Sequence, residues 1–446
     1  MLFSMYDYIL ERPDGYCIFN TLNTKYVKIN NEDDVKHFEE LLGMPDLPIE
    51  DPMVKELYDR GFVVENDLDE YAKAKNIIDE IDRKRDSQLA CLVYVTDQCN
   101  FRCVYCPEAH LSNNLPDSKW NALYKYIERS IEKENKKSVK IDFFGGEPLL
   151  QINKILEFLE KMKVLSKKHS VEMDFHFTSN GYLLTPEIYD KLVKLDFSYF
   201  FQITLDGFAE QHDKSRPLAN GAGSWAKIVE NLKYINTIDD KTRILLRTNI
   251  GPENQHILKE FHEWANATFT NKKFKFHIER VGRYSDRVDE AYVYNNSLED
   301  LVSLEIQASN TVNTNELLGF GILSAECHVA KKGFFTLAVN GNVYKCENNY
   351  LYDEFHDIPI GHLNDDGEIT YTKDIKELET YEYEKCETCK IYPICAGRTC
   401  PIRKIADPVN REDCTEKGMA YEYRLLKKIE SGVLDSFEEK NLFVKK

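Results

Sequence analysis

The sequence lacks long apolar runs and uninterrupted basic stretches. Its 446 residues contain no run of about 18 apolar residues, the length that a membrane-spanning helix needs. Lys and Arg total 58 against 76 Asp and Glu, which gives a net charge of −18. A general binder of nucleic acid or of anionic membranes is therefore disfavoured. Residues 1–8 carry Asp7 and no basic leader, so we expect a cytoplasmic protein.

The composition is that of a folded, multidomain chain with many cysteines. Hydrophobic residues make up 42% of it and aromatic residues 12%, enough apolar surface to offset the entropy of ordering. The length allows about three domains of ~150 residues. Twelve cysteines in a reducing compartment argue against a disulfide framework, and their clustering favours metal or iron–sulfur ligation.

The first 85 residues alternate short strand patterns with helix patterns. Strands are predicted at 6–10, 16–19, 26–29 and 62–64, and helices at 32–42 and 51–60. Asp51 can cap the second helix, Pro52 suits its first turn, and Gly61 can end it. This pattern is that of a small winged-helix unit. A charged helix over 69–86 follows and is expected to be a mostly solvated spacer.

Strand and amphipathic helix patterns then alternate from residue 89 to 279. The strands fall at 89–96, 139–144, 171–179, 199–205, 243–250 and 274–279, and the helices at 119–136, 152–168, 186–195, 225–238 and 253–266. Six β/α units predict an α/β fold with a parallel sheet, either an open barrel or a doubly wound sheet. In both, functional groups collect at the carboxyl edge of the sheet. The remaining residues have weaker periodicity and seven of the cysteines, so we expect their packing to depend on metal.

Three cysteines follow the first of these strands directly. Three residues separate Cys99 from Cys103, and two separate Cys103 from Cys106. Three local thiolates on a [4Fe–4S] cube leave one iron without a protein ligand, open to a substrate or cofactor. The alternatives are a zinc knuckle whose fourth ligand lies elsewhere and a coincidental group of buried cysteines.

This pattern resembles that of radical S-adenosylmethionine (SAM) enzymes, in which the amino and carboxylate groups of SAM chelate the open iron. The resemblance implies reductive cleavage of SAM to a 5′-deoxyadenosyl radical that abstracts hydrogen. Gly145, Gly146, Glu147 and Pro148 after the second strand strengthen it, since glycines permit close backbone approach and a carboxylate can receive the SAM ammonium. Alone, this motif could be a tight turn with a first-turn charge.

Polar residues also stand at the ends of the later strands. The resemblance implies contacts to the SAM ribose and methionine carboxylate there, with Thr204 and Arg216 suited to the carboxylate and Tyr105 to the adenine. Each residue taken alone could be a helix cap, an Asx turn or a surface charge. The further cofactor-binding candidates are Ser179, Asn180, Asp206 and Asn249.

The seven C-terminal cysteines are similar in spacing to the SPASM extension of radical SAM enzymes. The resemblance implies two auxiliary clusters, hence three [4Fe–4S] clusters in all. Four residues separate Cys395 from Cys400 where the family more often has about three, which could change which sulfur ligates which cluster. A zinc ribbon is the alternative. By resemblance Cys386, Cys389, Cys395 and Cys414 hold the outer cluster, and Cys327, Cys346 and Cys400 hold the inner one.

The inner cluster would then have an open iron, which a substrate thiolate could occupy. A distant group such as Cys17, Cys91 or a non-cysteine ligand could complete it instead, although both cysteines fall in strand patterns and are expected to be buried apolar residues. Glu347 follows Cys346 and is the candidate catalytic proton acceptor, with a solvated loop carboxylate as the alternative.

The resemblance as a whole implies a maturase of ribosomally made peptides. Its domains would be a winged-helix-like leader-recognition domain with a helical linker (1–85), a radical SAM partial (β/α)6 barrel (86–310) and a SPASM domain (311–446). The free sheet edge of the first could take a leader peptide as an added strand. The expected reaction joins a peptide carbon to a cysteine sulfur as a thioether, with flavodoxin or ferredoxin as electron donor and neither nucleic acid nor membrane as partner.

Two other functions remain open at this point. The same apparatus could form carbon–carbon or carbon–oxygen crosslinks, or oxidise a Cys or Ser of a partner protein to formylglycine. A non-catalytic iron–sulfur or zinc scaffold that binds a peptide for another enzyme belongs to a different class, and it would form no 5′-deoxyadenosine.

Overall fold

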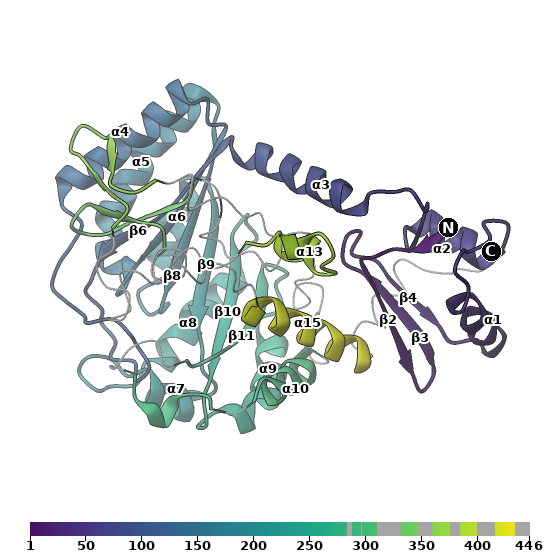
Figure 1. Ribbon diagram of the computed structural model, residues 1–446. Helices are drawn as coiled ribbons and strands as arrows, with labels where there is room; N and C mark the ends of the chain where they lie inside the picture. The colour runs from purple at the N-terminus through teal and green to yellow at the C-terminus, as the bar shows by residue number, and fades with distance from the viewer. Residues whose placement is uncertain are drawn as a thin grey trace.

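The computed structural model contains an N-terminal unit, a large α/β region and a C-terminal extension whose helices α13 (Tyr392–Cys395) and α15 (Thr415–Glu430) lie between them (Figure 1). It describes residues 1–282, 288–295, 297–309, 331, 333–346, 359–374, 384–398 and 415–432. Within these ranges the strands form sheets of two, three and ten strands. No helix in the described ranges is long and apolar enough to cross a bilayer.

The N-terminal unit has the strands and helices that its sequence predicts. Asp51 caps the second helix by accepting hydrogen bonds from the amides of Met53 and Val54, and Gly61 ends it in the left-handed conformation with φ 81°. A two-residue strand at the N-terminus was not predicted, because so short a run shows no alternation. The antiparallel sheet is β2 (Asp7–Arg12), β3 (Gly15–Asn20) and β4 (Tyr26–Ile29), the helices are α1 (Glu32–Leu42) and α2 (Pro52–Arg60), and β1 (Leu2–Phe3) pairs with β5 (Val63–Val64).

Six parallel strands lie side by side in sequence order and form the large region. They are β6 (Gln88–Thr96), β7 (Ser138–Gly145), β8 (Glu172–Ser179), β9 (Ser198–Thr204), β10 (Arg243–Ile250) and β11 (Phe274–Arg280). The connecting helices are α4 (Asp117–Lys133), α5 (Ile152–His169), α6 (Pro186–Lys194), α8 (Trp225–Asn236) and α9 (Leu258–Thr268). This confirms the predicted α/β fold.

Two helices differ from the prediction. The short α7 (Ala209–Ser215) was missed because its seven residues carry no apolar stripe. The helix expected from residue 253 begins only at Leu258, after a 3₁₀ turn over Gln255–Ile257.

The strands divide their side chains between two faces. In β7, Val139, Ile141 and Phe143 are buried among residues of the covering helices, whereas the alternate residues are only partly buried. The same alternation in β8 and β9 indicates one face packed against helices and one lining a concave interior. Packing on the helix side therefore fixes which strand ends meet at the carboxyl edge.

The C-terminal extension continues the same sheet. Strand β12 (Phe335–Leu337) pairs in parallel with β6, and β13 (Asn342–Tyr344), β14 (Gly361–Leu363) and β15 (Ile369–Tyr371) follow in antiparallel order. Three-residue strands give too little pattern to be recognised from sequence. The described helices after the barrel are α10 (Leu298–Ser309), α13 (Tyr392–Cys395) and α15 (Thr415–Glu430).

The connector helix α3 (Glu70–Arg85) is more than the solvated spacer expected from its charge. Ala74 and Ile78 on one face are buried, and the ring of Tyr71 lies 4.8 Å from that of Tyr392 in α13. Its charged residues occupy the other positions, which hid this small apolar face from the sequence analysis.

Candidate functional site

The cysteine loop leaves the carboxyl end of β6 and is tied to a segment distant in sequence. The amides of Arg102 and Val104 donate to the carbonyls of Pro217 and Ser215 at 2.9 and 3.0 Å. These bonds place the loop that bears Cys99, Cys103 and Cys106 beside the segment that contains Arg216. The expectation that these residues share one edge of the sheet is met.

The three thiols suit an iron–sulfur cluster. All are partly buried, and the Phe101 amide donates to Cys99 Sγ at 3.4 Å. Burial raises the pKa of each thiol, that of Cys99 to about 12, so the sulfurs need a bound cation to be held as thiolates. In the described part of the chain no three Cys, His, Asp or Glu side chains converge on a single metal ion. A cube is ligated at separate irons, so its cysteines need not converge in this way.

Gly145 and Gly146 bring the end of β7 against the start of the cysteine loop. The Gly146 amide donates a hydrogen bond to the Thr96 carbonyl at 3.0 Å, and the Glu147 amide donates one to the Gln98 carbonyl at 2.8 Å. A Cβ on Gly145 would lie 2.1 Å from Thr96 O, and one on Gly146 would lie 2.2 Å from Gln98 O. Only glycine permits this approach.

Glu147 is fully buried and holds the next strand end in place. Its carboxylate accepts hydrogen bonds from Ser179 Oγ at 2.8 Å, the Asn180 amide at 2.7 Å and the Leu149 amide at 3.0 Å. Burial raises the pKa of Glu147 to about 6, and these hydrogen bonds oppose that rise. The Asn180 side chain donates in turn to Asn100 Oδ1 at 2.8 Å, which joins β8 to the cysteine loop.

Tyr105 lies at the centre of a second polar network. Its hydroxyl donates to the Asp206 carboxylate and accepts from Arg216 Nη1 at 2.8 Å and from Asn249 Nδ2 at 3.1 Å. The Asn249 amide donates to Asp206 Oδ1 at 2.8 Å. Four of the candidate residues thus meet through direct contacts, at the ends of β9 and β10.

Arg216 retains a free donor in this network. Its side chain is buried, and among the described residues its Nε has no hydrogen-bond partner. The guanidinium also lies over the rings of Phe101 and Tyr105, 5.7 and 5.9 Å from their centroids. A buried cation with an unused donor is suited to an anionic ligand group. Thr204, at the end of β9 and two residues before Asp206, is also buried.

Three supporting residues were missed by the sequence analysis. The buried His212 accepts from the Asp206 amide at 3.1 Å through Nδ1, and its Nε2 lies 3.1 Å from Ser224 Oγ, which donates to the Arg216 carbonyl at 2.8 Å. Asn254 donates to the carbonyls of Asp206 and Asn249 at 3.0 and 2.9 Å. They lie in a helix and in loops, where no local sequence pattern distinguishes a supporting polar residue from a surface one.

The described auxiliary cysteines fall in two places. Cys346 packs with Leu92 and Tyr94 of β6, whereas Cys386, Cys389 and Cys395 pack against the N-terminal unit. Cys17 and Cys91 are fully buried in β3 and β6, as predicted. Cys327, Glu347, Cys400 and Cys414 lie outside the described residues.

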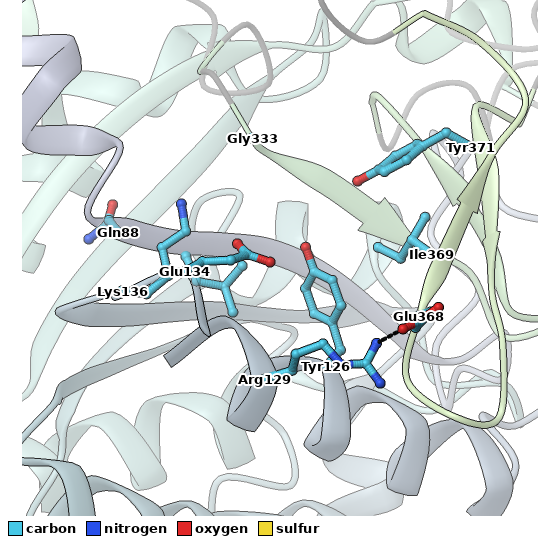
Figure 2. A pocket seen from close by; sticks show the side chains of 10 residues that line it. Gln88, Tyr126, Arg129, Glu134, Lys136, Gly333, Glu368, Ile369 and Tyr371 are labelled. Carbon is cyan, nitrogen blue, oxygen red and sulfur yellow. Dashed lines mark ion pairs between the residues drawn. The ribbon is translucent and has the colours of Figure 1, made fainter. Parts of the chain in front are cut away.

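A polar cavity of about 380 Å³ lies elsewhere, at the amino end of β6 (Figure 2). Arg129 and Glu368 form an ion pair of 2.9 Å on its wall, and Gln88, the first residue of β6, lines it. The candidate site is at the opposite end of the same strand.

Comparison with known proteins assigns the class. Residues 93–265 match the model of the Radical SAM superfamily. Residues 93–265 therefore form a radical SAM domain, and the family that this domain resembles implies a [4Fe–4S] cluster and SAM. The chain is homologous to a cysteine-type anaerobic sulfatase-maturating enzyme of Clostridium novyi (strain NT), to which it is 26% identical over 67% of this chain and 84% of that one.

Two solved structures share the fold. Native anSMEcpe with bound AdoMet and Cp18Cys peptide has a TM-score of 0.56 and 17% identity, and the match covers 79% of this chain and 99% of that one. Streptococcus suis SuiB bound to its precursor peptide SuiA has a TM-score of 0.51 and 14% identity, over 92% and 98% of the two chains. These similarities confirm the fold class; they do not assign a substrate.

Proposed function

We propose that this enzyme is a peptide maturase that forms thioether crosslinks. The observation that carries the proposal is the cysteine loop bonded to the Glu147 and Asp206 networks at one sheet edge, together with separate cysteine groups beyond the barrel. A scaffold protein would have no use for an open iron beside these buried charged side chains. The sequence relative and both structural neighbours are consistent with action on a peptide or protein.

Specific residues have proposed roles toward the cofactors. Cys99, Cys103 and Cys106 would hold the first [4Fe–4S] cluster, which with bound SAM supplies the 5′-deoxyadenosyl radical. Glu147 would receive the SAM ammonium and Arg216 its carboxylate, because each is a buried charge at this edge. The other proposed contacts are Tyr105, Gly145, Gly146, Pro148, Ser179, Asn180, Thr204, Asp206 and Asn249.

Formation of a thioether removes two hydrogens from the peptide. One hydrogen atom leaves the carbon and enters 5′-deoxyadenosine, and the thiol loses a proton as sulfur bonds to that carbon. One electron is left over. The proposed auxiliary clusters, held by the C-terminal cysteines, supply an acceptor for it.

We also propose that residues 1–85 bind the leader of the precursor peptide. Supporting this, the three-stranded sheet runs β2, β3, β4, so β4 (Tyr26–Ile29) is an edge strand within the described residues. An extended peptide can add to such an edge through backbone hydrogen bonds.

The experiment is anaerobic co-expression with a short cysteine-containing peptide encoded beside this chain, followed by intact mass spectrometry before and after thiol alkylation. We expect a loss of about two hydrogens per crosslink, no alkylatable thiol and no reversal by reductant. The same mass loss with thiols that still react would indicate carbon-based crosslinking instead of thioether formation.

Formylglycine formation is the second candidate, because the sequence relative is a sulfatase-maturating enzyme. It predicts consumption of a Cys or Ser side chain in a partner protein and a new aldehyde. A hydrazide probe that labels the product would favour this reaction over crosslinking.

A further inference from the structure

Three C-terminal cysteines are buried under the N-terminal unit. Cys386 and Cys389 pack with Tyr6 and Tyr392, and Cys389 and Cys395 pack against a second apolar group that includes Tyr8. By the family resemblance, these cysteines together with Cys414 would hold the outer auxiliary cluster. Tyr6, between β1 and β2, and Tyr8 of β2 would therefore form part of the wall of that cluster's site.

Polar contacts fasten this arrangement. Lys390, the residue after Cys389, donates to the Asp7 carbonyl at 2.7 Å, and its own carbonyl accepts from Thr21 Oγ1. Arg398, three residues after Cys395, pairs with Asp82 of α3. The segment that bears Cys386, Cys389 and Cys395 is thus held by both β2 and the connector helix α3.

Tyr6 stands out among the residues of this wall. Its side chain is fully buried, and its hydroxyl has no hydrogen-bond partner in the part of the chain that is described. The Glu70 carboxylate near it is already engaged by Ser4 Oγ and the Met5 amide. The hydroxyl of Tyr8, by contrast, donates to Glu422 at 2.8 Å.

An orphaned buried hydroxyl costs about 1–3 kcal/mol, so such groups call for an explanation. With Glu70 already engaged by Ser4 and Met5, the sulfurs of Cys386 and Cys389, which belong to the same buried cluster as Tyr6, are the acceptors left for this hydroxyl.

We propose that the Tyr6 hydroxyl donates a hydrogen bond to a sulfur of the outer auxiliary cluster held by Cys386, Cys389 and Cys395. This rests on the proposed function, which supplies that cluster. A hydrogen bond to sulfur favours the more negative, reduced state, so Tyr6 raises the cluster's reduction potential. The N-terminal unit thereby sets how readily the outer cluster accepts an electron.

The test is an EPR-monitored redox titration of the reconstituted full chain, comparing wild type with Tyr6→Phe. The substitution removes one oxygen and keeps the ring. We expect Tyr6→Phe to keep its full iron content. The reduction potential of one auxiliary cluster should fall, by a three- to tenfold change in its reduction equilibrium, and tenfold is about 59 mV for one electron. The potential of the cluster at Cys99 should not change. Tyr16→Phe is the matched control, since Tyr16 Oη only approaches Glu39 at 3.4 Å in an exposed position.

Unchanged potentials in Tyr6→Phe at full iron content would overturn the proposal. If Tyr6→Phe does not fold, the wild type decides: pulsed EPR in H₂O and D₂O should show a strongly coupled exchangeable proton at an auxiliary cluster, and its absence would overturn the proposal. Iron sufficient for only one cluster in wild type would instead refute the auxiliary-cluster assignment on which the proposal depends.

Discussion

At the scale of single residues, buried charge defines the candidate site. Glu147 and Asp206 accept backbone amides from neighbouring strand ends, and Arg216 offers a donor that no described residue uses. Type and position within the motifs made these residues predictable. The joint anchoring of Asp206 and Arg216 by Tyr105 was not predictable, because it depends on contacts between positions that are about 100 residues apart in the sequence.

Glu147→Gln should lower SAM affinity by about ten- to one-hundredfold, because a charge-assisted hydrogen bond of about 1.5–3 kcal/mol becomes a neutral one. Equilibrium binding of SAM to the reconstituted protein measures this. Glu157→Gln, on the exposed face of α5, is the control and should bind as wild type. Equal affinity in both variants would remove Glu147 from the proposed cofactor contacts.

At the scale of elements, the strands and their crossover helices were predictable because each has a long apolar pattern. The short strands β12 to β15 were not, since their pairing depends on β6, a partner far away in sequence. The apolar face of α3 was likewise hidden by its charges. Local pattern therefore predicted the barrel, while long-range contacts determine what is attached to it.

Gly146→Ala should destabilise the protein by about 1–3 kcal/mol and weaken SAM binding, because a methyl group would lie 2.2 Å from the Gln98 carbonyl and force the cysteine loop away from β7. Thermal unfolding and SAM titration measure the two effects. Gly43→Ala at the end of α1 meets only Glu40 O, at 3.5 Å, and is the control. A fully stable Gly146→Ala that binds SAM normally would contradict the close-approach argument.

Asp240→Asn should cost about 3–5 kcal/mol of unfolding free energy, because it leaves Lys273 of the 3.0 Å buried pair without its counter-ion. Although burial raises the pKa of Asp240, bonds from Tyr189, Thr242 and Lys273 lower it overall. The stabilisation by ionised Asp240 is therefore fully present above the pKa of an unfolded Asp, about 3.9, and is lost as the pH falls through the pKa of Asp240 in the folded protein.

Denaturant unfolding at pH 7 and at acid pH measures this loss. The difference in unfolding free energy between wild type and Asp240→Asn should become smaller as the pH falls. Lys241→Ala, which breaks an exposed pair with Asp196, should change stability by less than about 1 kcal/mol. A cost no larger than that of Lys241→Ala would show that the buried pair does not stabilise the fold.

At the scale of the whole molecule, the N-terminal unit and the C-terminal extension meet around Cys386, Cys389 and Cys395. Tyr8 bonds to Glu422 of α15, and apolar residues of β2 and β3 pack on α13 and α15 (Figure 1). Sequence predicted the three parts but not this contact, which joins residues more than 400 positions apart.

Deletion of residues 1–85 should reduce leader-peptide affinity at least tenfold, because the edge strand β4 is lost, while uncoupled SAM cleavage at Cys99, Cys103 and Cys106 continues. Fluorescence anisotropy with a labelled leader and chromatography of 5′-deoxyadenosine report the two separately. Cleavage serves as the control for folding. Leader affinity equal to that of the full chain would place recognition elsewhere.

The most direct test of the account is the stoichiometry of 5′-deoxyadenosine and modified peptide in an anaerobic reaction of the reconstituted protein with SAM, reductant and precursor peptide. The account predicts one 5′-deoxyadenosine for each two-hydrogen loss, and neither product from Cys99→Ala. Peptide modification without 5′-deoxyadenosine, or undiminished 5′-deoxyadenosine from Cys99→Ala, would contradict it.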